Sequence, residues 1–317
     1  MEEMENYVLQ AQGLTKHYGD LTAVADLTLE VRPGEIFGFL GPNGAGKTTS
    51  INMICGLLKP DAGRVLVHGE VLDGGTAAVR ARVGMCPQEI ILWPRLTCIE
   101  QLQFIGEMYN IPAREARKRG AELLEMLGLS EKADKLARTL SGGMQRRLNL
   151  AMALVHDPDI VVLDEAEAGL DPQSRVLVRE FIQALAQTKT VILTTHNMDE
   201  ADRVADRVAI IDHGKLLVLD TPENLKQRVG AGDVVELAIE GGLDAQSAAE
   251  LLTAQFENIN VEAADHTLIV RALGIVRLLA GILDCLEGAG VETGEVRLRE
   301  NTLEDVFIQL TGRRLRE

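Results

Sequence analysis

The segment GPNGAGKTT at residues 41–49 constrains the fold of this chain more than any other stretch. A glycine, four residues and then Gly-Lys-Thr form the pattern of a phosphate-binding loop. Glycines let the backbone bend so that several N–H groups converge on one phosphate, and a following helix adds partial positive charge. Lys47 would supply a full charge to the β- and γ-phosphates, and the Thr48 hydroxyl can ligate Mg²⁺. We therefore expect the nucleotide-binding residues Gly41, Pro42, Asn43, Gly44, Ala45, Gly46, Lys47, Thr48 and Thr49.

The residues around this loop predict the structural context that such a loop requires. The apolar stretch 35–40 (EIFGFL) predicts a buried strand that leads into the loop. The stretch 49–58 (TSINMICGLL) predicts a helix that leaves it, with apolar positions at Ile51, Ile54 and Leu57. A strand, a phosphate loop and a helix in this order indicate an α/β domain with a parallel sheet.

A second segment, VVLDEAEAGLDP at residues 161–172, places two acids at the end of an apolar run. The run Ile160–Leu163 is typical of a parallel strand covered on both faces, and ligands bind at the carboxyl ends of such strands. A solvated acidic turn would explain an isolated Asp-Glu pair, but this pair follows a phosphate loop. We expect Asp164 to hold Mg²⁺ and Glu165 to orient or deprotonate the attacking water.

The segment LSGGMQRRL at residues 140–148 resembles the signature motif of ABC-type ATPases. The resemblance extends over roughly residues 6–228. It implies a P-loop NTPase core with a RecA-like lobe, an antiparallel β-layer and a helical signature lobe. Ser141 is placed to cap the helix that follows, and its positive end is a second anion site. In the family this site serves the ATP held by a partner chain, which here assigns Ser141, Gly142, Gly143 and Gln145 to nucleotide binding.

The same resemblance assigns four further positions. Tyr18 in KHYGD matches the aromatic residue that stacks on adenine. Gln88 in CPQE matches the glutamine that senses the γ-phosphate and Mg²⁺ and faces the transport subunit, and Asp171 in GLDP matches a loop that communicates across a dimer. His196 in TTHNMDE matches the histidine that contacts the γ-phosphate. The predicted catalytic residues are Lys47, Glu165 and His196, and the predicted Mg²⁺ ligands are Thr48, Gln88 and Asp164.

One pair of residues departs from the family pattern. Family members usually carry Pro-Thr after the catalytic glutamate, whereas this chain has Ala166-Glu167. Loss of proline loosens the backbone, and Glu167 is expected to add a charge near the dimer face. We therefore expect dimer lifetime or ATP cooperativity to differ from the family pattern.

Two domains are expected: an ABC ATPase domain at 1–229, with a helical lobe at about 90–158, and an accessory domain at 230–317. Residues 231–317 hold 16 acids against seven Lys and Arg residues, which marks a change of composition. Their predicted βαββαβ order with a final helix indicates a small ferredoxin-like α+β domain. Its segment NTLEDVFIQLTGR resembles the C-terminal end of exporter ATPases that serve drug, lipid or polysaccharide permeases. A dimerisation or regulatory module is expected there, and binding of a small effector stays an alternative.

Charge and composition limit the partners of this chain. A net charge of −16 opposes an electrostatic grip on nucleic acid, and 3% aromatic residues supply few stacking platforms for bases. The acidic start is unlike a signal peptide, and no apolar run reaches the ~18 residues of a spanning helix. Four cysteines lack metal-type spacing, which indicates reduced thiols.

These observations together predict the ATP-binding and ATP-hydrolysing subunit of an ABC transporter, with export favoured over import. The resemblance implies a homodimer that sandwiches ATP head to tail. It also implies a separate membrane-spanning permease and a place at the cytoplasmic face of the membrane, with no nucleic-acid partner. The alternative is a soluble ABC ATPase that acts on nucleic acid or protein machinery. The cargo is not encoded in this chain, because cargo touches the permease.

Overall fold

The computed structural model describes residues 7–72, 77–229 and 233–312. Its contacts divide the chain into two compact units. The first unit runs to Thr221, and the second begins at Pro222. Within the described residues, no helix combines the length and the apolar character that a membrane span requires.

A six-stranded sheet of order β10-β9-β3-β8-β7-β6 forms the centre of the first unit. β3 pairs in parallel with β8 and β9, and β7 pairs in parallel with β6 and β8, whereas β10 is an antiparallel edge strand. The predicted strands before the phosphate loop and before the acid pair therefore lie in one parallel sheet. The strands are β3 (Ile36–Leu40), β6 (Val83–Cys86), β7 (Ile160–Asp164), β8 (Thr190–Thr195), β9 (Arg207–Asp212) and β10 (Lys215–Asp220).

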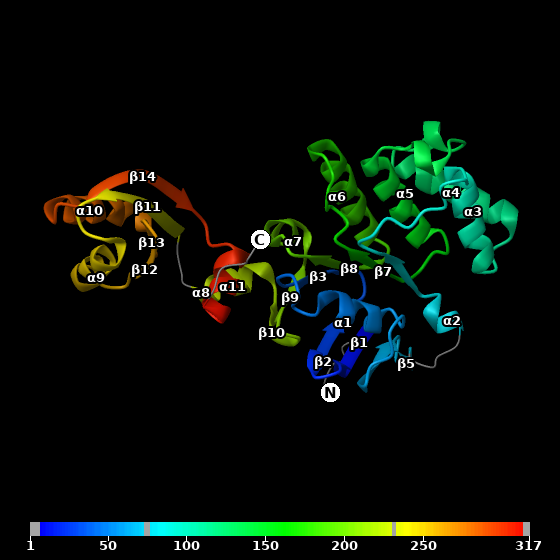
Figure 1. Cartoon of the computed structure of the whole chain (residues 1–317), viewed down its shortest axis with the longest axis horizontal. Helices are drawn as coiled ribbons and strands as arrows, with labels where there is room; N and C mark the ends of the chain where they lie inside the picture. Colours follow the sequence, from blue (N-terminus) through cyan, green and yellow to red (C-terminus); the bar gives the residue numbers. More distant parts are fainter. Residues whose placement is uncertain (1–6, 73–76, 230–232, 313–317) are drawn as a thin grey trace. The chain divides into compact units, whose positions relative to one another are not determined.

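Alternate side chains of these strands enter two different hydrophobic cores. Val161 and Leu163 of β7 pack on the face covered by α5 and α6, whereas Ile160 and Val162 pack on the face of α1 (Figure 1). Both faces are buried, which explains why β7 is apolar throughout. The helices are α1 (Lys47–Ile54), α5 (Gly142–Leu154), α6 (Pro172–Ala186) and α7 (Met198–Val204).

An antiparallel sheet of order β2-β1-β4-β5 forms the β-layer over α1, as expected. The helical lobe contains α3 (Cys98–Met108) and α4 (Ala113–Met126). Thr97 caps α3, because its side chain accepts from Glu100 N and the Glu100 carboxylate accepts from Thr97 N. The remaining elements of the first unit are β1 (Leu9–Tyr18), β2 (Leu21–Val31), β4 (Ala62–Val67), β5 (Glu70–Val71), α2 (Ala77–Arg80) and the 3₁₀ turns Ser130–Lys132 and Ala137–Thr139.

Two expected local features differ in the structure. The helix after the phosphate loop ends at Ile54 instead of continuing to residue 58, because Gly56 adopts φ +69° and Leu57 is 67% exposed. The Gly214-Lys215 pair within RVAIIDHGKLLVLD predicts a hairpin turn between the strands now seen as β9 and β10. The turn is formed instead by His213 and Gly214, both with positive φ, while Lys215 already pairs with Asp212 in the sheet.

The second unit has the element order of a ferredoxin-like domain after an initial helix. The helix α8 belongs to this unit and packs against α11, so the division falls earlier than the expected boundary at residue 230. α9 and α10 share one hydrophobic core with β11 and β13. The sheet order is β12-β13-β11-β14. The elements are α8 (Pro222–Val229), β11 (Asp233–Gly241), α9 (Ala245–Gln255), β12 (Asn260–Ala264), β13 (Thr267–Ala272), α10 (Ile275–Gly288), β14 (Glu292–Arg299) and α11 (Leu303–Thr311).

The residues of the NTLEDVF segment form the start of helix α11. Thr302 and Asp305 form a capping box, and the buried Asp305 carboxylate also accepts from Arg271 at 2.9 Å and from Arg299. Burial alone would raise the pKa of Asp305, but hydrogen bonds from Arg299 and Thr302 hold this pKa below its ordinary value. The segment therefore ties α11 to β13 and β14.

We expect Asp305→Asn to destabilise this unit by about 1.5–3 kcal/mol, because the buried Arg271 and the partly exposed Arg299 each lose one of two carboxylate partners. Faster amide hydrogen exchange in β13 and α11 at pH 7 would measure the loss, with the exposed neighbour variant Glu304→Gln as control. Because the pKa of Asp305 is lower in the folded state, its carboxylate stabilises the fold at pH values above its unfolded pKa of about 3.9. This contribution is lost as the pH falls below that value. The difference between wild type and Asp305→Asn should therefore shrink between pH 5 and pH 3. A constant difference would contradict the ionic interpretation.

Candidate nucleotide-binding site

The phosphate loop joins β3 to α1 at the carboxyl end of the parallel sheet. Gly46 has φ +99° directly before α1, and a side chain there would clash with the Ala23 carbonyl oxygen. A side chain at Gly41 would clash with the carbonyl oxygen of Ile211. Gly44 has φ +81° and faces open space. The glycines therefore shape a backbone cradle that other residues would fill or strain.

Lys47 lies inside this loop and not on the surface. Its ammonium group donates to the carbonyl oxygens of Gly41 at 2.6 Å and Pro42 at 3.1 Å. Burial lowers the pKa of Lys47, and the charges of Glu165 and Asp164 oppose that shift. The hydrogen bonds given for this ammonium, among the described residues, are to backbone carbonyl oxygens. Phosphate oxygens of a bound nucleotide can replace these acceptors. The cradle and this cation fit a nucleotide phosphate.

Asp164 ends β7 and Glu165 directly follows it, near Lys47, and both side chains are buried. The Thr194 hydroxyl of β8 donates to the Asp164 carboxylate and so fixes its orientation. Glu165 has φ +50°, a conformation that side chains other than glycine seldom adopt. Its N–H donates to the Thr194 carbonyl at 3.1 Å, which helps to hold the strained backbone in place.

Gln88 and His196 converge on the Glu165 carboxylate from opposite neighbours of β7. The Gln88 amide nitrogen, after β6, donates to Glu165 Oε2 at 3.0 Å. His196 Nδ1, after β8, lies 2.9 Å from Glu165 Oε1. The fold thus gathers Lys47, Gln88, Asp164, Glu165 and His196 at one edge of the sheet. This edge can hold a phosphate, a cation and a water.

Arg146 is a residue of this site that the sequence reasoning missed. It is 4% exposed on α5 and donates to five backbone carbonyl oxygens. Two belong to Pro87 and Gln88, and three belong to 164–166, at distances of 2.6–3.3 Å. The available signal was its place on the same helical face as the buried residues Leu150 and Ala153.

We expect Arg146→Lys to lower the unfolding free energy by about 3 kcal/mol or more. Lysine has three donors on one nitrogen, so at least two buried carbonyls lose a charged partner worth about 1.5–3 kcal/mol each. Thermal unfolding would measure this effect. The control is Arg147→Lys, because Arg147 makes one such bond, to the Leu127 carbonyl at 2.7 Å. Equal melting temperatures for the two variants would contradict the prediction.

Other predicted site residues belong to β1 and to the signature segment. Tyr18 ends β1 with a ring that is 51% exposed. Ser141 caps α5 as expected, Gly142 faces open space, and Gln145 donates to the carbonyls of Ala137 and Leu140. These side chains belong to the signature segment, whose Gly143 lies beside Ser174 and Asp171.

Asp171 caps α6, and Pro172 occupies the first turn of that helix. Its carboxylate accepts from the N–H groups of Gln173 at 3.1 Å and Ser174 at 3.0 Å. The bonds with Ser174 hold the pKa of Asp171 below its ordinary value. Its local role is therefore to start α6.

Glu167 was expected to add a charge near the dimer face, and within this chain that charge is paired. Its side chain is 2% exposed and forms an ion pair with Arg179 of α6 at 3.1 Å. The Glu167 carboxylate is therefore buried against Arg179 and is not displayed on the surface of the chain.

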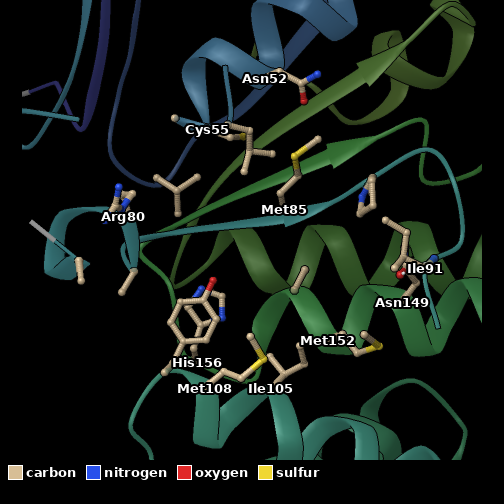
Figure 2. A pocket seen from close by; sticks show the side chains of 18 of the residues that line it. Asn52, Cys55, Arg80, Met85, Ile91, Ile105, Met108, Asn149, Met152 and His156 are labelled. Carbon is tan, nitrogen blue, oxygen red and sulfur yellow. Dashed lines mark hydrogen bonds between the residues drawn. The ribbon is translucent and has the colours of Figure 1, made fainter. Parts of the chain in front are cut away.

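Figure 2 shows a cleft of ≈ 860 Å³ whose lining includes Pro87 and Ile91, on either side of Gln88 in the sequence. Its lining combines α1, β6, the residues after Gln88, α3 and α5, and much of it is apolar. Ile91 and Met108 contribute side chains that are 56% and 63% exposed. The rings of His156 and Tyr109 stack with their centroids 3.9 Å apart. Burial lowers the pKa of His156 to about 4, so that this histidine is neutral at pH 7. The cleft thus presents exposed apolar surface next to a proposed catalytic segment.

Comparison with known proteins places this geometry in a family. The family described as ABC transporter matches residues 24–168. The linearmycin resistance ATP-binding protein LnrL of Bacillus subtilis is 38% identical over 98% of this chain and 100% of its own length. The Nod factor export ATP-binding protein I of Ralstonia nicotianae is 42% identical over 98% of this chain and 95% of its own. The daunorubicin resistance ATP-binding protein DrrA3 of Streptomyces coeruleorubidus is 37% identical over 99% of both chains.

Solved structures agree with this fold. The subunit cbiO1 of Clostridium perfringens, part of the ABC transporter complex cbiONQ, is 27% identical with a TM-score of 0.64 over 71% of this chain and 94% of its own. A dimeric post-hydrolysis state of the ATP-binding cassette MJ0796 with ADP and Pi is 27% identical with a TM-score of 0.62, over 67% of this chain and 98% of its own. The predicted α/β core is confirmed, and the chain belongs to the ABC transporter family of ATP-binding proteins.

Proposed function

We propose that this chain is the ATP-binding and ATP-hydrolysing subunit of an exporter and drives a separate membrane permease. The single observation that carries the hydrolytic part is the convergence of Gln88 and His196 on Glu165, beside Lys47. Export is supported by relatives that are named for resistance to linearmycin and daunorubicin and for Nod factor export. The alternative, a soluble ABC ATPase that acts on nucleic acid or protein machinery, has no comparable support.

In this proposal the residues divide the work of phosphoryl transfer. The phosphate-loop N–H groups and Lys47 hold the β- and γ-phosphates, and Tyr18 stacks on the adenine. Glu165 takes the proton of the attacking water or orients it, and His196 contacts the γ-phosphate. Mg²⁺ would neutralise charge on the phosphates. Its proposed ligands are the Thr48 hydroxyl, the Asp164 carboxylate and the Gln88 amide oxygen, which are the hard oxygen donors that Mg²⁺ prefers.

Two copies are proposed to close head to tail over two ATP molecules. The cassette MJ0796 is dimeric in a post-hydrolysis state with ADP and Pi, which supports a dimer. In this chain the exposed N-terminus of α5, with Ser141 and Gly142, would bind the ATP of the partner copy. ATP then stabilises only the closed state of the dimer, so the free energy of ATP binding shifts the two copies from the open to the closed state.

The cleft beside Gln88 is the proposed docking site for a permease segment. A transport ATPase needs a contact that joins its catalytic site to the membrane subunit, and Pro87 and Ile91 of this cleft flank Gln88. Its exposed apolar side chains suit an amphipathic helix laid into a groove. The proposal places the chain at the cytoplasmic face of the membrane, held there through the permease.

Co-purification from gently solubilised native membranes, followed by mass spectrometry, tests this function. We expect a partner with several hydrophobic spans to co-purify with the wild-type chain. Met108→Arg should lose that partner while keeping ATP binding. The control Met126→Arg should retain it, since Met126 is 56% exposed on α4 outside this cleft. A chain found only with ribosomal or DNA-repair proteins would reject the exporter and favour the soluble alternative.

A further inference from the structure

The turn between β7 and α6 carries Glu165 at its start and Asp171 at its end. Arginine side chains hold both ends of this turn. Arg146 binds the carbonyls at 164–166, and Arg175 Nε donates to the Leu170 carbonyl at 3.0 Å. The middle of the turn lacks a rigid residue, because Ala166, Ala168 and Gly169 are small.

Glu167 supplies a third attachment in the middle of this turn. Its carboxylate oxygen lies 3.1 Å from Arg179 on the second turn of α6. The Glu167 side chain is 2% exposed, and that of Arg179 is 23% exposed. Burial of a carboxylate is costly unless a cation compensates it, so the pair is strongly coupled. A turn that folds back onto its own helix through such a pair is held in one position.

We propose that the Glu167–Arg179 ion pair positions the turn that aims Glu165 at the attacking water. This inference rests on the proposed ATPase function and goes beyond the family pattern, because it concerns the residues that replace Pro-Thr. Glu167 acts through Glu165 and is a positioning residue. A proline would restrict this turn through its own ring, whereas here an ion pair to α6 does so.

The backbone of Glu165 explains why such a restraint matters. A non-glycine residue at φ +50° costs on the order of 1–3 kcal/mol, and it persists only where its surroundings hold it. Release of the turn at Glu167 would let this backbone relax. Displacement of a catalytic group by about 1 Å can lower a rate by about a hundredfold.

The charge of Glu167 also lies near the histidine side of the site. Glu200 of α7 accepts from the Thr195 hydroxyl at 2.9 Å, next to His196. Burial raises the pKa of Glu200, and the charge of Glu167 raises it further. Glu167 therefore lies close to the acid that accepts from Thr195, the residue before His196.

Steady-state ATPase kinetics of the full chain, with ATP dissociation constants measured separately, test this inference. Glu167→Gln keeps the shape of the side chain and removes its negative charge. Arg179→Lys keeps the positive charge and removes the planar guanidinium group. We expect Glu167→Gln to lower kcat about tenfold with the ATP dissociation constant within twofold of wild type. Arg179→Lys should give a smaller loss, and the double variant should be no slower than Glu167→Gln. The matched control Glu180→Gln removes an exposed carboxylate from the same helix and should equal wild type.

The outcomes separate this inference from the function on which it rests. A wild-type kcat in Glu167→Gln, or losses that multiply in the double variant, would overturn the ion-pair inference and leave the ATPase intact. A parallel loss of ATP affinity and melting temperature, without a selective loss of kcat, would also overturn it, since this is the result of a merely structural pair. Absence of turnover in the wild-type chain would instead reject the proposed function.

Discussion

Glu165→Gln should lower ATP turnover by about 10²–10⁴-fold, the usual contribution of a general base, while ATP binding stays within about threefold of wild type. Glutamine fills the same space and can keep the contacts to Gln88 and His196, whose atoms lie 3.0 and 2.9 Å from this carboxylate. It cannot accept a proton from water. Single-turnover hydrolysis and a binding titration with fluorescent ATP measure the two quantities separately.

The control for this prediction is Glu125→Gln, which removes an exposed carboxylate from α4. Turnover within twofold of wild type in Glu165→Gln would show that Glu165 is not the base. The same variant tests the head-to-tail dimer, because it should accumulate the ATP-bound state. Light scattering should then report a dimer with ATP and a monomer without it, and a monomer in both conditions would count heavily against the sandwich.

Lys47→Ala should raise the ATP dissociation constant at least about thirtyfold. Truncation of one partner of a buried charge pair costs about 2–5 kcal/mol, and about 1.4 kcal/mol corresponds to a factor of ten. Lys47 is 7% exposed, so water does not replace its ammonium easily. Isothermal titration with ATP and, separately, with ADP measures the change, and the loss should be larger for ATP because the lysine reaches the γ-phosphate.

Two further variants make the Lys47 result specific. Lys47→Met preserves the volume of the side chain and should weaken binding similarly, which excludes collapse of the loop as the cause. Lys118→Ala removes an exposed lysine on α4 and should leave affinity unchanged. Wild-type affinity in both Lys47 variants would reject the assignment of the phosphate cradle.

The sequence by itself determined the parts of this protein that depend on local residue order. The glycine spacing at 41–46 requires a tight loop, and the apolar runs at 36–40 and 160–163 require buried parallel strands. Capping residues such as Thr97 and Ser141 mark helix starts within a few positions of their own. These are short-range requirements of backbone geometry and burial, so they can be read without the fold.

Only the tertiary structure decided how distant segments meet. The five carbonyls that Arg146 contacts lie up to 59 residues from it in the sequence, and no local pattern encodes such a set. Glu167 was expected to add a charge near the dimer face. The structure buries its side chain and pairs it with Arg179 of α6, a contact that the sequence does not indicate. Pairing and burial of a charge depend on which elements pack around it, and that information exists only in the folded chain.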